Sequence, residues 1–122
     1  MNNKLILIGL LSVSMISSME QLLKQAKAEA DSVRDLRRGP LLSWVMNHNA
    51  IVVEKRLANG ELDSSFGSDG YTVTKVGTKN YYEIYYKGPC EVLHDKVLVT
   101  VKIDGVPMQL VYTANGTLES FK

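Results

Sequence analysis

The feature that most constrains this chain is its N-terminal stretch, where an uncharged apolar run passes into an amphipathic pattern without a turn residue. Residues 5–19 carry no charge, and Lys4 lies directly before them. A run of this length is typical of the central region of a signal peptide, because a free-standing membrane span needs about 20 residues. The only small residues near its end are serines, and no Ala-x-Ala cleavage pattern follows directly.

The apolar pattern then continues at the spacing of a helix. One face is formed by Leu22, Leu23, Ala26, Ala30, Val33 and Leu36, at steps of three and four residues. Charged residues fill the other faces, and Gly39-Pro40 ends the pattern. A continuous helix over residues 4–38 would be about 50 Å long at 1.5 Å per residue. We therefore divide the chain into an N-terminal helix, residues 1–38, and a small α+β globular domain, residues 39–122.

Two interpretations of the apolar run remain open. It is either a signal peptide that is removed, or a retained stalk that lies in a membrane or against neighbouring helices. In the second case the membrane or assembly surface consists of Leu5, Ile6, Leu7, Ile8, Leu10, Leu11, Val13, Ile16 and Met19. These interpretations lead to different functions.

The rest of the chain predicts one more helix and a small sheet. Residues 41–58 favour a second helix, although "IVV" is also typical of a strand. Residues 61–70 are rich in turn formers and predict a surface loop. "YTVTKV" and "YYEIYY" alternate and predict two strands paired through "GTKN", and "GPCEVLHDK" suggests a helical turn after Pro89. "VLVTVKI" and "MQLVYT" predict a hairpin, which "ANG" turns into "TLESF".

The expected fold class is therefore α+β. A long N-terminal helix, apolar in its first half and amphipathic in its second, packs on an antiparallel sheet of three to four strands. The stripe from Leu22 to Leu36 is the expected cover of one sheet face. Charge is nearly balanced, with 14 basic and 13 acidic residues, so we expect no nucleic-acid partner.

Few residues suggest chemistry. Cys90 and His94 could share a helical face with Asp95 beside them, as in an activated thiol, but a buried free cysteine is the simpler interpretation. Tyr81, Tyr82, Tyr85 and Tyr86 favour cross-strand packing over base stacking. The loop acids Asp63 and Asp69 lack the spacing of a calcium loop. Asn115-Gly116-Thr117 matches a glycosylation sequon, but it also fits a hairpin turn, which is the interpretation we adopt. We expect no enzyme, catalytic residue, cofactor or metal.

Three segments resemble the type IV pilins, in particular the type IVb pilins and minor pilins. They are the apolar-to-amphipathic helix, "LANGELDSSFGSDGYTV" before the first strand, and "YYEIYYKGPCEVLHDKV", where the family has a strand and a short cysteine-bearing helix. The chain departs from that family in two places. No acid occurs before Glu20, where the family has a glutamate near its mature N-terminus, and no second cysteine pairs with Cys90.

The resemblance implies a structural subunit of a type IV pilus-like filament or a related secretion apparatus. Such a subunit assembles with copies of itself or similar subunits through its apolar helix, after storage in the inner membrane, and ends in a cell-surface filament. The alternative is a secreted or periplasmic α+β binding or inhibitor protein with a cleaved signal peptide.

Overall fold

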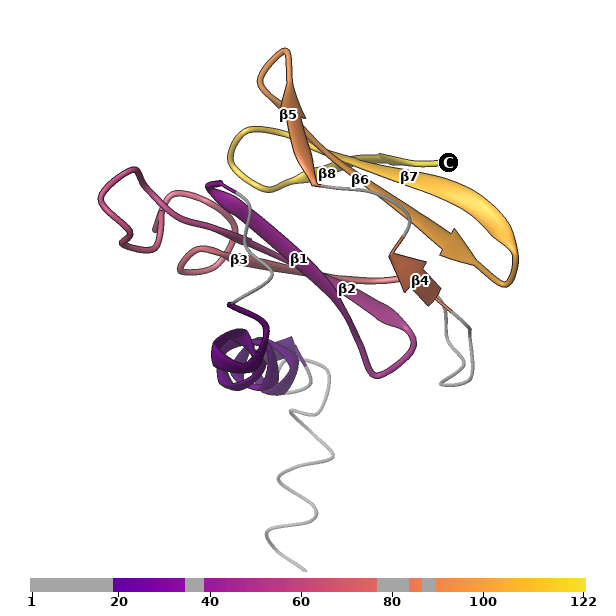
Figure 1. Ribbon diagram of the computed structural model, residues 1–122, viewed down its shortest axis with the longest axis horizontal. Coiled ribbons are helices and arrows are strands. Elements are labelled where there is room, and N and C mark those ends of the chain that lie inside the picture. Colours follow the sequence, from indigo (N-terminus) through magenta and orange to yellow (C-terminus); the bar gives the residue numbers. More distant parts are fainter. Residues whose placement is uncertain (1–18, 35–38, 77–83, 87–89) are drawn as a thin grey trace, which may run out of the picture.

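The protein is built in three layers, a helix and two antiparallel β-sheets (Figure 1). The computed structural model describes residues 19–34, 39–76, 84–86 and 90–122. A three-stranded sheet lies in the middle, with the helix on one face and a five-stranded sheet on the other. The α+β class expected from the sequence is therefore present, with one helix packed on antiparallel sheets.

The middle sheet begins with a hairpin where a second helix was predicted. Strands β1 (Leu41–Met46) and β2 (Ala50–Lys55) pair antiparallel, with Trp44 opposite Val52. Both faces of this hairpin are buried: Leu42, Trp44 and Met46 face the helix, whereas Leu41 and Val45 face the second sheet. The helix prediction for residues 41–58 is wrong because a strand buried on both faces lacks polar alternation and cannot be told from a buried helix by periodicity.

The third strand of the middle sheet, β3 (Tyr71–Lys75), pairs with β2. Its predicted pairing with "YYEIYY" is wrong, since the described part of that segment, β4 (Ile84–Tyr86), pairs with β6 in the other sheet. Residues 77–83, which include the predicted "GTKN" turn, Tyr81 and Tyr82, lie outside the described residues. The chain therefore passes from one sheet to the other between these two strands.

The outer sheet is larger than the sequence suggested. Its members are β4, β5 (Glu91–Leu93), β6 (Lys96–Ile103), β7 (Val106–Tyr112) and β8 (Leu118–Phe121). Strands β4 and β5 both pair with β6, and the order continues through β7 to β8. The described residues contain eight strands, so the prediction of three to four is wrong. The expected helical turn after Pro89 is also wrong, because β5 occupies that position.

The predicted hairpin of β6 and β7 and the predicted turn into the last strand are confirmed. Asp104 and Gly105 have positive φ angles of 48° and 86° and join β6 to β7, as a two-residue Asp-Gly hairpin turn requires. Residues 113–117 join β7 to β8, where Thr113 and Gly116 close the turn through a hydrogen bond of 2.9 Å. These turns depend on local chemistry, which is why the sequence was sufficient to find them.

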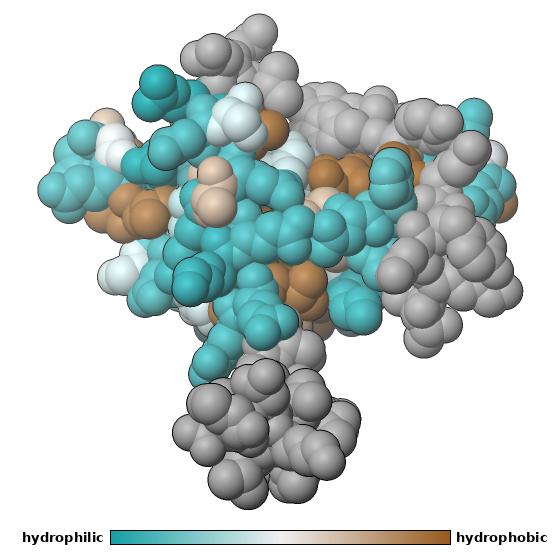
Figure 2. Space-filling view, turned by 90° about the horizontal axis from the view of Figure 1, so that it is seen from below, coloured by the Kyte–Doolittle hydropathy of each residue, from teal (hydrophilic) through white to brown (hydrophobic). Residues whose placement is uncertain are grey.

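The helix covers residues 19–33 of the described chain. Its inner face contributes Ala26 and Ala30, which are buried, and Leu22, Leu23 and Val33, which pack partly buried against the same cluster. The predicted helical segments 4–18 and 35–38, including Leu36, lie outside the described residues. Figure 2 looks onto this layer and shows mostly hydrophilic side chains on its outer surface.

Candidate functional site

Cys90, His94 and Asp95 are arranged by a strand and a turn. Cys90 precedes β5, and His94 and Asp95, with φ angles of 51° and 61°, form the two-residue turn that leads into β6. The predicted shared helical face is therefore wrong. Burial raises the pKa of the Cys90 thiol to about 12, and the Ser43 hydroxyl beside it only partly offsets this effect. The thiol is protonated at neutral pH, whereas a cysteine nucleophile or metal ligand needs the thiolate.

Two acids of the loop at residues 61–70, Asp63 and Asp69, have partners within the protein. Asp63 is nearly buried, and its Oδ1 accepts hydrogen bonds from the Ser65 hydroxyl at 2.6 Å and the Ser65 backbone N–H at 3.0 Å. The Ser65 hydroxyl and the Lys55 ammonium, 3.2 Å from Oδ2, hold the pKa of Asp63 below its usual value. Asp69 pairs with Lys27 of the helix at 3.3 Å. These carboxylates therefore brace the loop.

The same loop contains a side chain that sequence reasoning missed. Phe66 is fully buried in the cluster between the two sheets, and the Lys55 ammonium lies 6.0 Å from its ring centroid. A lone aromatic residue within a turn-rich segment was the available signal. Among residues 19–34, 39–76, 84–86 and 90–122, no three or more His, Cys, Asp or Glu side chains are arranged to hold a metal ion.

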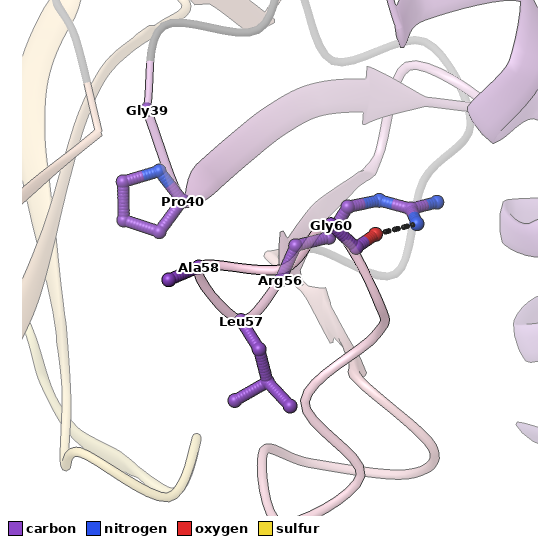
Figure 3. A pocket seen from close by; sticks show the side chains of 6 residues that line it. All are labelled: Gly39, Pro40, Arg56, Leu57, Ala58 and Gly60. Atoms are coloured by element: carbon purple, nitrogen blue, oxygen red, sulfur yellow. Dashed lines mark hydrogen bonds between the residues drawn. The ribbon is translucent and has the colours of Figure 1, made fainter.

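An open pocket lies at the end of the β1–β2 hairpin (Figure 3). It has a volume of about 480 Å³ and is lined by Gly39, Pro40, Arg56, Leu57, Ala58 and Gly60. Arg56 does not offer a free charge here, because its Nε donates to the buried Glu54 carboxylate at 3.1 Å and its Nη1 donates to the Gly60 carbonyl at 2.8 Å. The pocket therefore suits an apolar group better than an anion.

Exposed apolar side chains gather on short strands of the outer sheet. Val92 and Leu93 on β5 are more than half exposed, and Leu118 and Phe121 on β8 are exposed to 40% and 36%. Strands β5 and β8 lie at opposite edges of that sheet. Of the four predicted tyrosines, the backbones of Tyr85 and Tyr86 lie on β4, opposite Lys102 and Val101. Short edge strands limit edge-to-edge pairing, so the exposed apolar side chains of β5 and β8 are better suited to side-chain contacts with a protein.

The predicted membrane or assembly residues fall almost wholly outside the described part of the chain. Leu5, Ile6, Leu7, Ile8, Leu10, Leu11, Val13 and Ile16 lie there, and only Met19 is described, with 42% of its surface exposed. Within the residues that are described, no helix has the length and apolar character needed to cross a membrane.

The comparisons with known proteins did not assign the chain to a family. No protein-family model matches the sequence. Searches of curated proteins and of solved structures also gave no match.

Proposed function

We propose that this chain is a non-enzymatic structural subunit that assembles through its N-terminal apolar segment, most concretely a subunit of a type IV pilus-like filament or related secretion apparatus. The observation that carries the proposal is the docking of the helix at residues 19–33. Its apolar stripe packs on the middle sheet, and the uncharged run of residues 5–19 leads into it along the chain. An uncharged apolar segment that is joined to a docked helix could anchor the folded domain in a membrane or a filament.

Assembly would depend on the packing of apolar segments and would involve no chemical reaction. Before assembly the apolar segments lie in the inner membrane. During assembly they leave the lipid and pack against the segments of neighbouring subunits, which are copies of this chain or similar pilin-like subunits. Removing apolar side chains from water contributes about 25 cal/mol per Å², on the order of 10 kcal/mol per subunit, and this term holds the segment equally in lipid or in the filament. The transfer from lipid to the filament therefore depends on close packing between segments. The α+β domain is displayed at the cell surface.

A second candidate is a secreted or periplasmic binding protein whose apolar segment is a cleaved signal peptide. The exposed apolar side chains of β5 and β8, and the pocket beside Pro40 in which Arg56 is paired with Glu54 and Gly60, favour it, because accessible apolar side chains can contact a protein partner. In this candidate the domain alone binds a partner.

A charge placed in the apolar segment separates the two candidates. Leu11→Asp should shift a retained anchor from the membrane or filament fraction to the soluble fraction, because a carboxylate at the centre of a span costs about 3 kcal/mol. Leu118→Asp, at an exposed position of the domain, is the matched control and should leave the distribution unchanged. If Leu11→Asp only slows export and the wild-type protein is already soluble, the binding protein is the correct candidate.

A further inference from the structure

At the centre of its contact with the middle sheet, the helix contributes only small side chains. Ala26 and Ala30 are the buried residues of the described helix, with 0% and 6% of their surface exposed, and alanine side chains do not interlock with a sheet surface in the way that larger residues do. The partly buried Leu22, Leu23 and Val33 lie around them. Apolar packing of this kind holds the helix close to the sheet but defines its rotation and its position along the axis only weakly.

Polar side chains on one flank of the helix contact the first hairpin of the sheet. Gln25 and Asn47 form a reciprocal amide pair, in which each side-chain nitrogen donates to the other oxygen at 2.8 and 3.1 Å. Asn47 is held in the left-handed region, with φ of 57°, in the turn between β1 and β2. The amide pair therefore connects the helix to a turn whose own geometry is fixed.

One helical turn further along, the same flank contacts β1. Glu29 accepts a hydrogen bond from the Trp44 indole N–H at 3.1 Å, and its second oxygen accepts from Gln25 at 2.8 Å. Gln25 and Glu29 are four residues apart and lie on one side of the helix, because that spacing is close to one turn. The two contacts thus form a continuous chain from the β1–β2 turn to the strand.

The opposite flank is connected as well. Lys27 lies about 200° around the helix axis from Gln25, at 100° per residue. Its ammonium is 3.3 Å from Asp69, in the turn that precedes β3. The helix is therefore connected on one side to the start of the sheet and on the other side to its third strand.

We infer that these polar contacts form a two-sided clasp that fixes the rotation and register of the helix on the sheet. The inference rests on the proposed function and deepens it, because a helix held in one register makes the domain follow the orientation of the segment that anchors it. Gln25, Glu29 and Lys27 are positioning residues in this account. Their contribution is to orientation, while the apolar cluster holds the helix to the sheet.

Trp44 reports on the clasp directly, because it is the only tryptophan of the chain. Acrylamide quenching of its fluorescence is measured on the full chain in mild detergent. Glu29→Ala should raise the quenching constant about twofold or more, because a helix that turns or slides uncovers a side chain that is 7% exposed. Glu29→Gln keeps an oxygen that can accept from the indole but loses the second oxygen that accepts from Gln25, so its quenching constant should lie between those of the wild type and Glu29→Ala. Glu20→Ala, at an exposed position of the same helix, is the control.

A second variant tests the clasp without straining the backbone of the hairpin. Asn47→Gly removes the amide but suits the positive φ of the turn, so the β1–β2 hairpin is not strained. Hydrogen exchange of the helix amides should become faster in this variant, while amides of β6 and β7 keep their wild-type protection. A change confined to the helix is what loss of the clasp produces, since a general loss of stability would affect both regions.

The clasp is overturned if Glu29→Ala and Glu20→Ala give the same quenching, if Glu29→Gln behaves as Glu29→Ala does, or if helix and strand amides in Asn47→Gly change together or not at all. None of these readouts requires assembly. Failure of the wild-type chain to associate with membranes or filaments would overturn the proposed function and leave the clasp intact.

Discussion

The backbone N–H of Gly67 donates to the carbonyl of Asn115 at 2.7 Å, which joins the loop before β3 to the turn between β7 and β8. The two backbone segments approach so closely that a Cβ atom on Gly116 would lie 2.8 Å from the Gly67 nitrogen. The contact lies next to the buried Phe66 along the chain. A Cβ atom on Gly116 would push these two backbones apart, whereas a Cβ atom on Gly67 would meet the Tyr71 carbonyl oxygen of its own segment.

Gly67→Ala should therefore destabilise the protein by about 3 kcal/mol or more, because the new Cβ would meet the Tyr71 carbonyl oxygen at 2.1 Å and the φ angle is +56°. Gly105→Ala is the matched control. It also has a positive φ angle, of +86°, but its Cβ would meet nothing within 4 Å, so a loss of about 1 kcal/mol is expected. Urea unfolding of both variants measures the difference. Equal losses would mean that backbone conformation, and not close approach, decides the effect.

Ile84 tests the crossing of the chain between the two sheets. It is 7% exposed and belongs to the cluster between them, so Ile84→Asp should cost on the order of 4 kcal/mol through burial of an unpaired charge. Val106→Asp, at a position that is 56% exposed, should change the free energy of unfolding by less than about 0.5 kcal/mol. If the two variants lose similar stability, β4 does not pack as described.

The sequence identified the elements whose signals are local. The Asp104-Gly105 turn fixed the β6–β7 hairpin, and the three- and four-residue spacing from Leu22 to Val33 marked the helix face that packs on the sheet. The predictions from sequence failed where strand pairing is decided by residues that are distant along the chain. Nothing near residues 41–55 reveals that a second sheet will bury their other face, and nothing in β4 reveals that it will pair with β6.

In the candidate site, too, features with a local sequence signal could be predicted and features that depend on distant residues could not. The separation of Cys90 and His94 suggested a helical face, but His94 and Asp95 have the positive φ angles of a hairpin turn. Asn, Asp and His adopt such angles more readily than most residues, so "HD" between apolar residues was a usable turn signal. The pocket beside Pro40 has no sequence signature, because its lining comes from two segments brought together by the hydrogen bond from the Arg56 N–H to the Pro40 carbonyl.

Cys90 should make the protein less stable at alkaline pH. Its pKa is raised to about 12 in the folded state, while the unfolded thiol ionises near the usual value of about 8.5. The folded chain therefore holds a proton that the unfolded chain releases. The stabilising contribution is fully present below about pH 8.5 and is lost progressively as the pH rises toward 12, by up to about 1.4 kcal/mol per pH unit.

Denaturant unfolding at a series of pH values between 8 and 11 measures this slope. Cys90→Ser should reduce it, whatever its effect on stability at neutral pH, because the side chain can no longer ionise in this range. Biological function should survive both Cys90→Ser and His94→Ala. An unchanged slope in Cys90→Ser would place the thiol in contact with water, and loss of function in both variants at an unchanged melting temperature would indicate a catalytic pair.

The hydrogen bond between the Tyr112 hydroxyl and the Thr74 hydroxyl joins the two sheets at 2.7 Å. Tyr112→Phe should cost about 1 kcal/mol, and Thr74→Val should cost a similar amount. The double variant should lose less than the sum of the two single losses, because both changes remove the same bond. Strict additivity in this double-mutant cycle would show that the two hydroxyls do not interact.

The intact mass of the protein isolated from its native cells, together with the fraction in which it sediments, tests the proposed function most directly. A retained anchor predicts a mature chain that begins at residue 10 or earlier and that sediments with membranes or filaments. A soluble chain that begins near residue 20 or later would contradict it, because the apolar segment would then have served only for export.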